Sequence, residues 1–112
     1  MIRTRVADDM DNGTVLAVSN AYIKKYYFND EFALLPPAIQ DEIQILCVTF
    51  TEEIGGIFML FFDADGNLRI RTESSESDIL YDDIGAGLKV RSIQEDNEEL
   101  FRSLELFYRT FS

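Results

Sequence analysis

The chain has 112 residues, of which 46% are apolar, so it is long enough to bury one hydrophobic core and form a single domain. Its formal charge of −11 argues against binding to nucleic acid or to an anionic membrane, because both attract clustered Lys and Arg. The lack of His and the single cysteine, Cys47, exclude an internal disulfide, a Cys-cluster metal site and the commonest general base.

The N-terminal part of the chain carries weak structural signals. Residues 1–13 are charged and hold few apolar side chains, which predicts a frayed tail in front of a domain spanning 14–112. No signal peptide is apparent, so a cytoplasmic location is expected. Residues 14–18 are apolar and predict a strand or an extended arm. Residues 20–28 suit either a short helix or a strand, and the sequence leaves this choice open.

The densest apolar run begins with a predicted helix over residues 37–54. Pro37 suits a first helical turn, and Gly55 is typical of a helix end. The β-branched residues would also suit a strand, but the length of the run and its end signals favour the helix. The apolar side chains recur every three or four residues, at Ile39, Ile43, Leu46, Phe50 and Ile54. Cys47 lies on this apolar side and is predicted to be buried.

A β-hairpin is predicted over about residues 56–73. The first strand, 57–62, is apolar on both faces, so we expect the central helix to cover one face and another segment or a second subunit to cover the other. The return strand, 68–73, alternates between apolar and charged residues. The intervening Asp63–Asn67 segment predicts a tight turn. A calcium loop is disfavoured, because the twelfth position from Asp63 is Ser74 rather than Glu.

Two C-terminal helices are predicted, over about 78–94 and 96–111, and they are compatible with one continuous helix. The first follows an apolar stripe and is weakened by Gly85 and Gly87, which could instead let another backbone approach closely. That stripe contains Leu80, Tyr81, Ile84 and Leu88. The second repeats apolar residues at Leu100, Leu104, Phe107 and Phe111, with acidic residues at its start and Arg109 near its end.

The predicted fold class is therefore α+β. A small antiparallel sheet, made of the central hairpin and compatible with a third N-terminal strand, packs against the central helix and one or two C-terminal helices.

The sequence predicts no catalytic, cofactor-binding or metal-binding residue. The adjacent carboxylates of Asp82–Asp83 and Glu52–Glu53 suggest a metal-dependent enzyme only as a minor alternative, because neighbours on a helix point about 100° apart. We expect a non-catalytic protein–protein interaction module that forms a homodimer, and another protein as partner is a further possibility. An acidic regulator of a basic partner is the alternative. The candidate interface residues are Phe101, Leu106 and Tyr108, which lie off the main helical stripe, and Phe58, Leu60 and Phe62 of the apolar strand.

Several runs of the sequence resemble a known family. They are YIKKYYFNDEFALLP, IQDEIQILCVTFTEEIGGIF, FFDADGNL and the closing LELFY. The resemblance is to short acidic proteins of clostridia-type Gram-positive bacteria, a family known only as a domain of unknown function, and it covers residues 15–110. It implies a bacterial, cytoplasmic origin and no activity, cofactor or catalytic residue.

Overall fold

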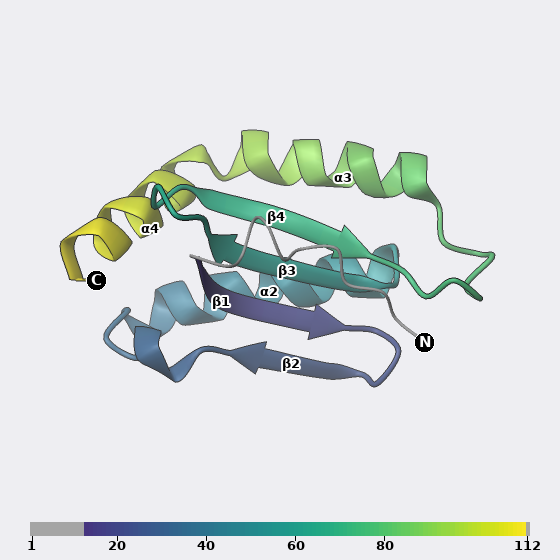
Figure 1. The fold of residues 1–112 in the computed structure, drawn as a ribbon, viewed down its shortest axis with the longest axis horizontal. Helices are drawn as coiled ribbons and strands as arrows, with labels where there is room; N and C mark the ends of the chain where they lie inside the picture. The colour runs from purple at the N-terminus through teal and green to yellow at the C-terminus, as the bar shows by residue number, and fades with distance from the viewer. Residues whose placement is uncertain (1–12, 112) are drawn as a thin grey trace.

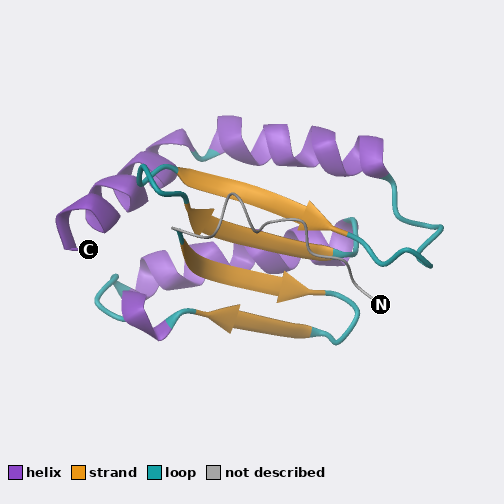
Figure 2. Ribbon diagram, viewed as in Figure 1, coloured by secondary structure: helices purple, strands orange, loops and turns teal. Residues whose placement is uncertain are grey.

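The computed structural model describes residues 13–111, which form one antiparallel sheet with helices packed against it (Figure 1). The strands are β1 (Thr14–Asn20), β2 (Lys25–Phe28), β3 (Ile57–Phe62) and β4 (Leu68–Glu73), in the order β2-β1-β3-β4. The helices are the short 3-10 helix η1 (Asp30–Phe32) and the α-helices α2 (Pro37–Glu53), α3 (Asp83–Asp96) and α4 (Glu98–Phe111). Figure 2 shows α2 crossing behind the sheet and α3 running along its β4 side. The predicted α+β class is confirmed. Except for Gly13, the predicted tail lies outside the described residues.

The N-terminal segment supplies two strands. The predicted strand over residues 14–18 extends to Asn20, and the open choice for residues 20–28 is decided in favour of a strand, β2, which pairs with β1. Asn20 caps no helix; its side chain accepts a hydrogen bond from the Tyr22 N–H at 2.9 Å and so helps to start the turn between the strands.

A β-bulge at Leu16 shifts the register between β1 and β3. The Asn29 side chain donates to the Val15 carbonyl, and the Asn29 N–H donates to the Leu16 carbonyl, at 2.7 and 2.9 Å. These bonds satisfy backbone groups that the irregular pairing would otherwise leave open. Leu16 itself is fully buried in the core.

The core lies between α2 and the sheet. Alternate residues of β3 point toward the helix, and Phe50 of α2 packs on Phe58 with ring centroids 4.7 Å apart. Cys47 is buried beside them, as predicted. On the other face of β3, Met59 pairs with Arg71 across the strands. The helix-facing half of β3 is therefore covered within a single chain.

The turn between β3 and β4 follows the prediction closely. The Asp63 carboxylate accepts the N–H groups of Asp65 and Asn67, each at 2.9 Å, and forms an ion pair with Arg69 at 2.8 Å. Gly66 adopts a φ of +83°, which a glycine tolerates without strain. The Asp63 side chain therefore organises a hairpin turn.

The first C-terminal helix starts later than predicted. It begins at Asp83 rather than near residue 78, because the Asp82 side chain caps it by accepting the N–H groups of Ile84 and Gly85 at 3.1 and 3.0 Å. Of the predicted stripe, Tyr81 packs against the core, whereas Leu80, Ile84 and Leu88 are exposed. The buried residues of α3 are Ala86 and Ile93. The small Ala86 allows the helix to pack closely on the core, and Ile84 and Leu88 lie on the side that faces solvent.

The two C-terminal helices are separate. Asn97 leaves helical geometry with a φ of −125°, and both its backbone N–H and its side chain donate to the Ile93 carbonyl, at 3.1 and 2.9 Å. The change of backbone direction at Asn97 ends α3, and α4 begins at the next residue.

Candidate functional site

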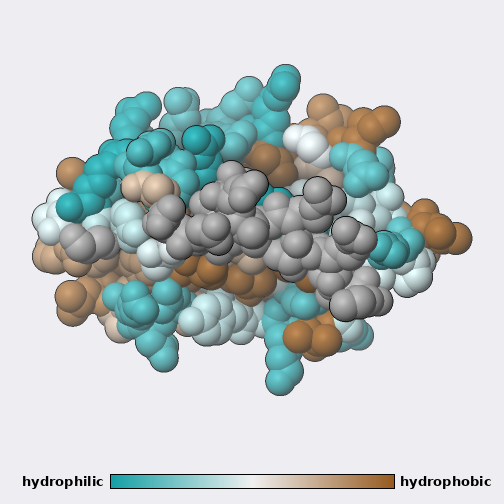
Figure 3. Space-filling model, in the orientation of Figure 1, coloured by the Kyte–Doolittle hydropathy of each residue, from teal (hydrophilic) through white to brown (hydrophobic). Residues whose placement is uncertain are grey.

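Four large aliphatic side chains form an exposed cluster on α3 and on the loop that precedes it. Ile79, Leu80, Ile84 and Leu88 are 91%, 90%, 79% and 65% exposed, and we call this cluster the α3 patch. In Figure 3, hydrophobic atoms project from the molecule over the beginning of α3 and the preceding loop. Single exposed aliphatic residues are common on protein surfaces, whereas several of them close together in one segment mark a candidate interaction site.

The loop that carries half of the α3 patch is held in place by Tyr22 of the β1–β2 turn. The Tyr22 hydroxyl donates to the Asp78 carboxylate at 2.6 Å and accepts the Ser75 N–H at 2.9 Å. Partial burial, followed by the hydrogen bond to Asp78, raises the pKa of Tyr22. A link across 56 positions of sequence thus presents Ile79 and Leu80 on an anchored loop.

Charged groups surround the α3 patch unevenly. Carboxylates lie at its N-terminal end, on Glu76, Asp78, Asp82 and Asp83. At its other end, Arg91 follows Leu88 on the exposed side of α3. The patch therefore has several carboxylates at one end and a single arginine, Arg91, at the other.

Between these ends lies Gly87, which is exposed and whose surroundings are open. A Cβ atom added at Gly87 would meet no other group within 4 Å. By contrast, a Cβ atom added at Gly85 would come within 2.5 Å of the Asp82 carboxylate that caps the helix. Steric contact with Asp82 therefore explains why residue 85 is a glycine, whereas no contact within the chain explains the glycine at residue 87.

The structure separates the predicted interface residues into two groups. Leu106 is 66% exposed on α4, whereas Phe101 is half-buried and packs against the core. The Tyr108 ring stacks on Phe62, with centroids 4.2 Å apart and planes 2° from parallel, and its hydroxyl hydrogen-bonds Thr14 at 2.9 Å. The predicted strand residues Phe58, Leu60 and Phe62 are all buried within the chain.

The sequence predicts both Phe62 and Tyr108 as interface residues. In the structure their rings stack on each other within one chain. The exposed residues that sequence reasoning missed as a site were Ile79, Leu80, Ile84 and Leu88, three of which lie in or beside the predicted helical stripe. The sequence signal that could have indicated this site is the apolar stripe of α3 together with Gly87, for which the packing of the chain gives no reason.

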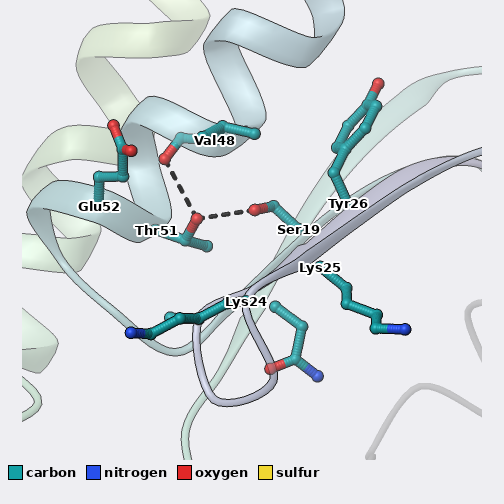
Figure 4. A pocket seen from close by; sticks show the side chains of 9 residues that line it. Ser19, Lys24, Lys25, Tyr26, Val48, Thr51 and Glu52 are labelled. Carbon is teal, nitrogen blue, oxygen red and sulfur yellow. Dashed lines mark hydrogen bonds between the residues drawn. The ribbon is translucent and has the colours of Figure 1, made fainter.

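A pocket of about 430 Å³ lies between the C-terminal end of α2 and the β1–β2 turn (Figure 4). At its base the Thr51 hydroxyl donates to the Val48 carbonyl at 3.1 Å, so the Ser19 hydroxyl must donate the bond that joins it to Thr51 at 2.7 Å. In Figure 4, the Lys24 and Lys25 side chains extend in opposite directions, and both nitrogens lie away from the hydroxyl pair. The two hydroxyls are already paired with each other, and neither lysine reaches them, so this lining is poorly suited to an anion.

Tyr26 also lines this pocket. Its hydroxyl is buried and has no hydrogen-bond partner among the described residues, and burial raises its pKa strongly. Burial also raises the pKa of the Cys47 thiol to about 12, which keeps it protonated and unreactive.

The carboxylate pairs considered for metal binding have other roles. Asp82 caps α3, and Glu53 forms an ion pair with Lys89 at 2.8 Å that links α2 to α3. In residues 13–111, no three or more Cys, Asp or Glu side chains come together in a way that could hold a metal ion. None of the described helices has the length and apolarity needed to cross a membrane.

Comparison with known proteins places the chain in a family. Residues 13–112 match the model of a family of unknown function, DUF6145, which covers nearly the whole sequence. The chain belongs to this family. This confirms the resemblance to a family of unknown function, while the bacterial group and acidity expected for its members stay predictions. No match was found among curated proteins or among solved structures.

Proposed function

We propose that the protein is a non-catalytic protein–protein interaction module that forms a homodimer through the α3 patch. The observation that carries this proposal is the exposure of four aliphatic side chains on one anchored surface, at 65% to 91%. This interface replaces the buried strand residues of β3, while Leu106 of α4, which is 66% exposed, stays a predicted contact.

The apolar area of the patch favours a second copy as partner. A two-fold contact buries the same surface on both subunits, so it removes eight exposed aliphatic side chains from water. Each contributes about 1.5–3 kcal/mol when fully buried, so the contact contributes on the order of 10–20 kcal/mol. Lost translational and rotational freedom opposes association by roughly 4–15 kcal/mol, so a dimer of moderate affinity is feasible.

A second candidate function is the regulation of a basic protein. The four carboxylates at the N-terminal end of the patch and the formal charge of −11 favour this partner. The two candidates differ in their response to salt. Screening weakens attraction between an acidic and a basic protein, whereas it reduces the net repulsion between two acidic copies.

The decisive experiment is the mass in solution, measured by size-exclusion chromatography with light scattering in physiological salt. The unmodified chain is expected to elute at about twice 12.9 kDa in the tens of micromolar range. Ile84→Glu should give a monomer. Leu34→Glu is the matched control, because Leu34 is also 79% exposed but lies on the connection before α2.

Two results would overturn the proposal. One is that the unmodified chain remains a monomer at a protein concentration of several hundred micromolar, because the dimer would then be weaker than the apolar area of the patch predicts. The other is an equal loss of dimer in Ile84→Glu and Leu34→Glu, which would show a general effect of added negative charge.

A further inference from the structure

We propose that two copies pair α3 against α3 in antiparallel orientation, with the two-fold axis at Gly87 and with Asp83 of each copy facing Arg91 of the other. This arrangement depends on the proposed homodimer and specifies its register. It is argued from the spacing of three exposed residues on α3 and from the charges at its two ends.

Asp83, Gly87 and Arg91 are spaced four residues apart, so they form one ridge along the helix surface. All three are exposed. Along the helix axis, Asp83 and Arg91 lie roughly 6 Å to either side of Gly87. A two-fold axis through Gly87 and perpendicular to the helix therefore places each Asp83 opposite the other copy's Arg91. The apolar residues Ile84 and Leu88 form the adjacent ridge.

Gly87 supplies the close approach that such a contact needs. Glycine is less favourable than alanine inside a helix, and Gly87 has no positive φ that would require it. The chain leaves the space around it empty. A helix face without a side chain at its centre lets a second backbone come near, and the flanking Ile84 and Leu88 side chains then close around it.

Electrostatics favours the antiparallel orientation over a parallel one. In an antiparallel pair, the positive end of each helix dipole lies beside the negative end of the other. A parallel pair would instead place the carboxylates of Asp82 and Asp83 from both copies side by side. The net repulsion between two chains of charge −11 acts at long range, and physiological salt screens it beyond about 8 Å.

A charge exchange between two variants tests the register directly. Asp83→Arg alone would set Arg against Arg in its own homodimer, and Arg91→Asp alone would set Asp against Asp. Each is expected to raise the dimer dissociation constant by about tenfold or more. In the heterodimer of the two variants, both facing pairs have opposite charges, so a one-to-one heterodimer should form in an equimolar mixture with near wild-type affinity. Native mass spectrometry resolves the three possible dimers by mass.

Gly87→Ala provides an independent test that does not depend on charge. The substitution should leave the monomer at least as stable in thermal melts, because alanine favours the helix. It should nevertheless weaken the dimer several-fold, because the added methyl separates the two backbones. Unchanged or tighter dimerisation of Gly87→Ala would exclude close approach at this residue.

The outcomes distinguish the register from the proposed function. If the unmodified chain dimerises, Ile84→Glu abolishes the dimer and the mixed charge variants form no heterodimer, then the patch is correct and the antiparallel register is wrong. If the unmodified chain is a monomer, the homodimer and its register are both wrong. A heterodimer in the mixture, with both single variants folded by circular dichroism, supports the whole arrangement.

Discussion

Lys24 provides a test of backbone strain in this fold. Among the described residues, it is the one non-glycine residue with a positive φ, at +53°, and it ends the turn between β1 and β2. Left-handed backbone brings the Cβ atom of an L-residue close to the following carbonyl oxygen, which costs about 1–2 kcal/mol. Lys24→Gly removes this clash.

The expected gain is smaller than the strain itself. Glycine loses more backbone freedom on folding than other residues, which opposes the gain by about 0.5–1 kcal/mol. We therefore expect Lys24→Gly to raise the free energy of unfolding by about 0.5–1 kcal/mol. For a domain of this size, the melting temperature should rise by roughly 2–6 °C.

Lys25→Gly is the matched control, because it removes the same charge from the neighbouring residue. Lys25 lies in β2 and pairs with Asn20, and its φ is not positive. Glycine there relieves no strain, so the free energy of unfolding should fall by about 0.5–1 kcal/mol. Both variants are to be followed by thermal and urea denaturation at one protein concentration, because dimerisation makes the melting temperature concentration-dependent.

Opposite signs for the two glycine variants are the result that the backbone geometry requires. Destabilisation by Lys24→Gly, or equal shifts in both variants, would refute the reasoning. Either result would mean that the lysine side chain contributes more than its backbone strain removes.

Two further predictions concern the turn after β3 and the α4 contact. Arg69, followed by backbone N–H groups, lowers the pKa of Asp63, so its contribution to stability is present above the ordinary carboxyl pKa and is lost as pH falls toward the lowered value. The melting temperature of Asp63→Asn should accordingly lie below that of the unmodified chain at pH 7 and converge with it in acid; a constant difference would contradict this. Tyr108→Phe keeps the stacking on Phe62 and loses only the hydrogen bond to Thr14, so it should destabilise by about 0.5–1.5 kcal/mol. Tyr108→Ala should cost about 3–5 kcal/mol in denaturant titrations, and a smaller loss would show that the ring is not part of the core.

The sequence by itself determined the elements whose signals are local. The period of the apolar residues predicts α2, and Gly55 and Gly56, with φ of +94° and +70°, lie at the predicted boundary between α2 and β3. The β3–β4 hairpin was equally readable, because the turn is organised by the side chain of Asp63 within its own segment. In both cases, the residues that carry the sequence signal lie within the element itself, so no contact with a distant segment is needed to predict it.

The candidate site was the part that the sequence could not place. Phe62 and Tyr108 lie 46 positions apart and stack on each other, so residues that suggest an interface when read separately satisfy each other inside the chain. The stripe of α3 suggests a core face, yet the small Ala86 packs inward and leaves Ile84 and Leu88 outside.

The tertiary structure also decided the N-terminal half of the sheet. Residues 20–28 suit helix and strand equally, and pairing between β1 and β2 selects the strand despite the strain at Lys24. Hydrogen bonding across the sheet and burial of one face depend on residues distant in sequence. Local signals therefore determined α2 and the β3–β4 hairpin, whereas strand pairing selected β2, and packing between distant segments decided which apolar surfaces remain exposed.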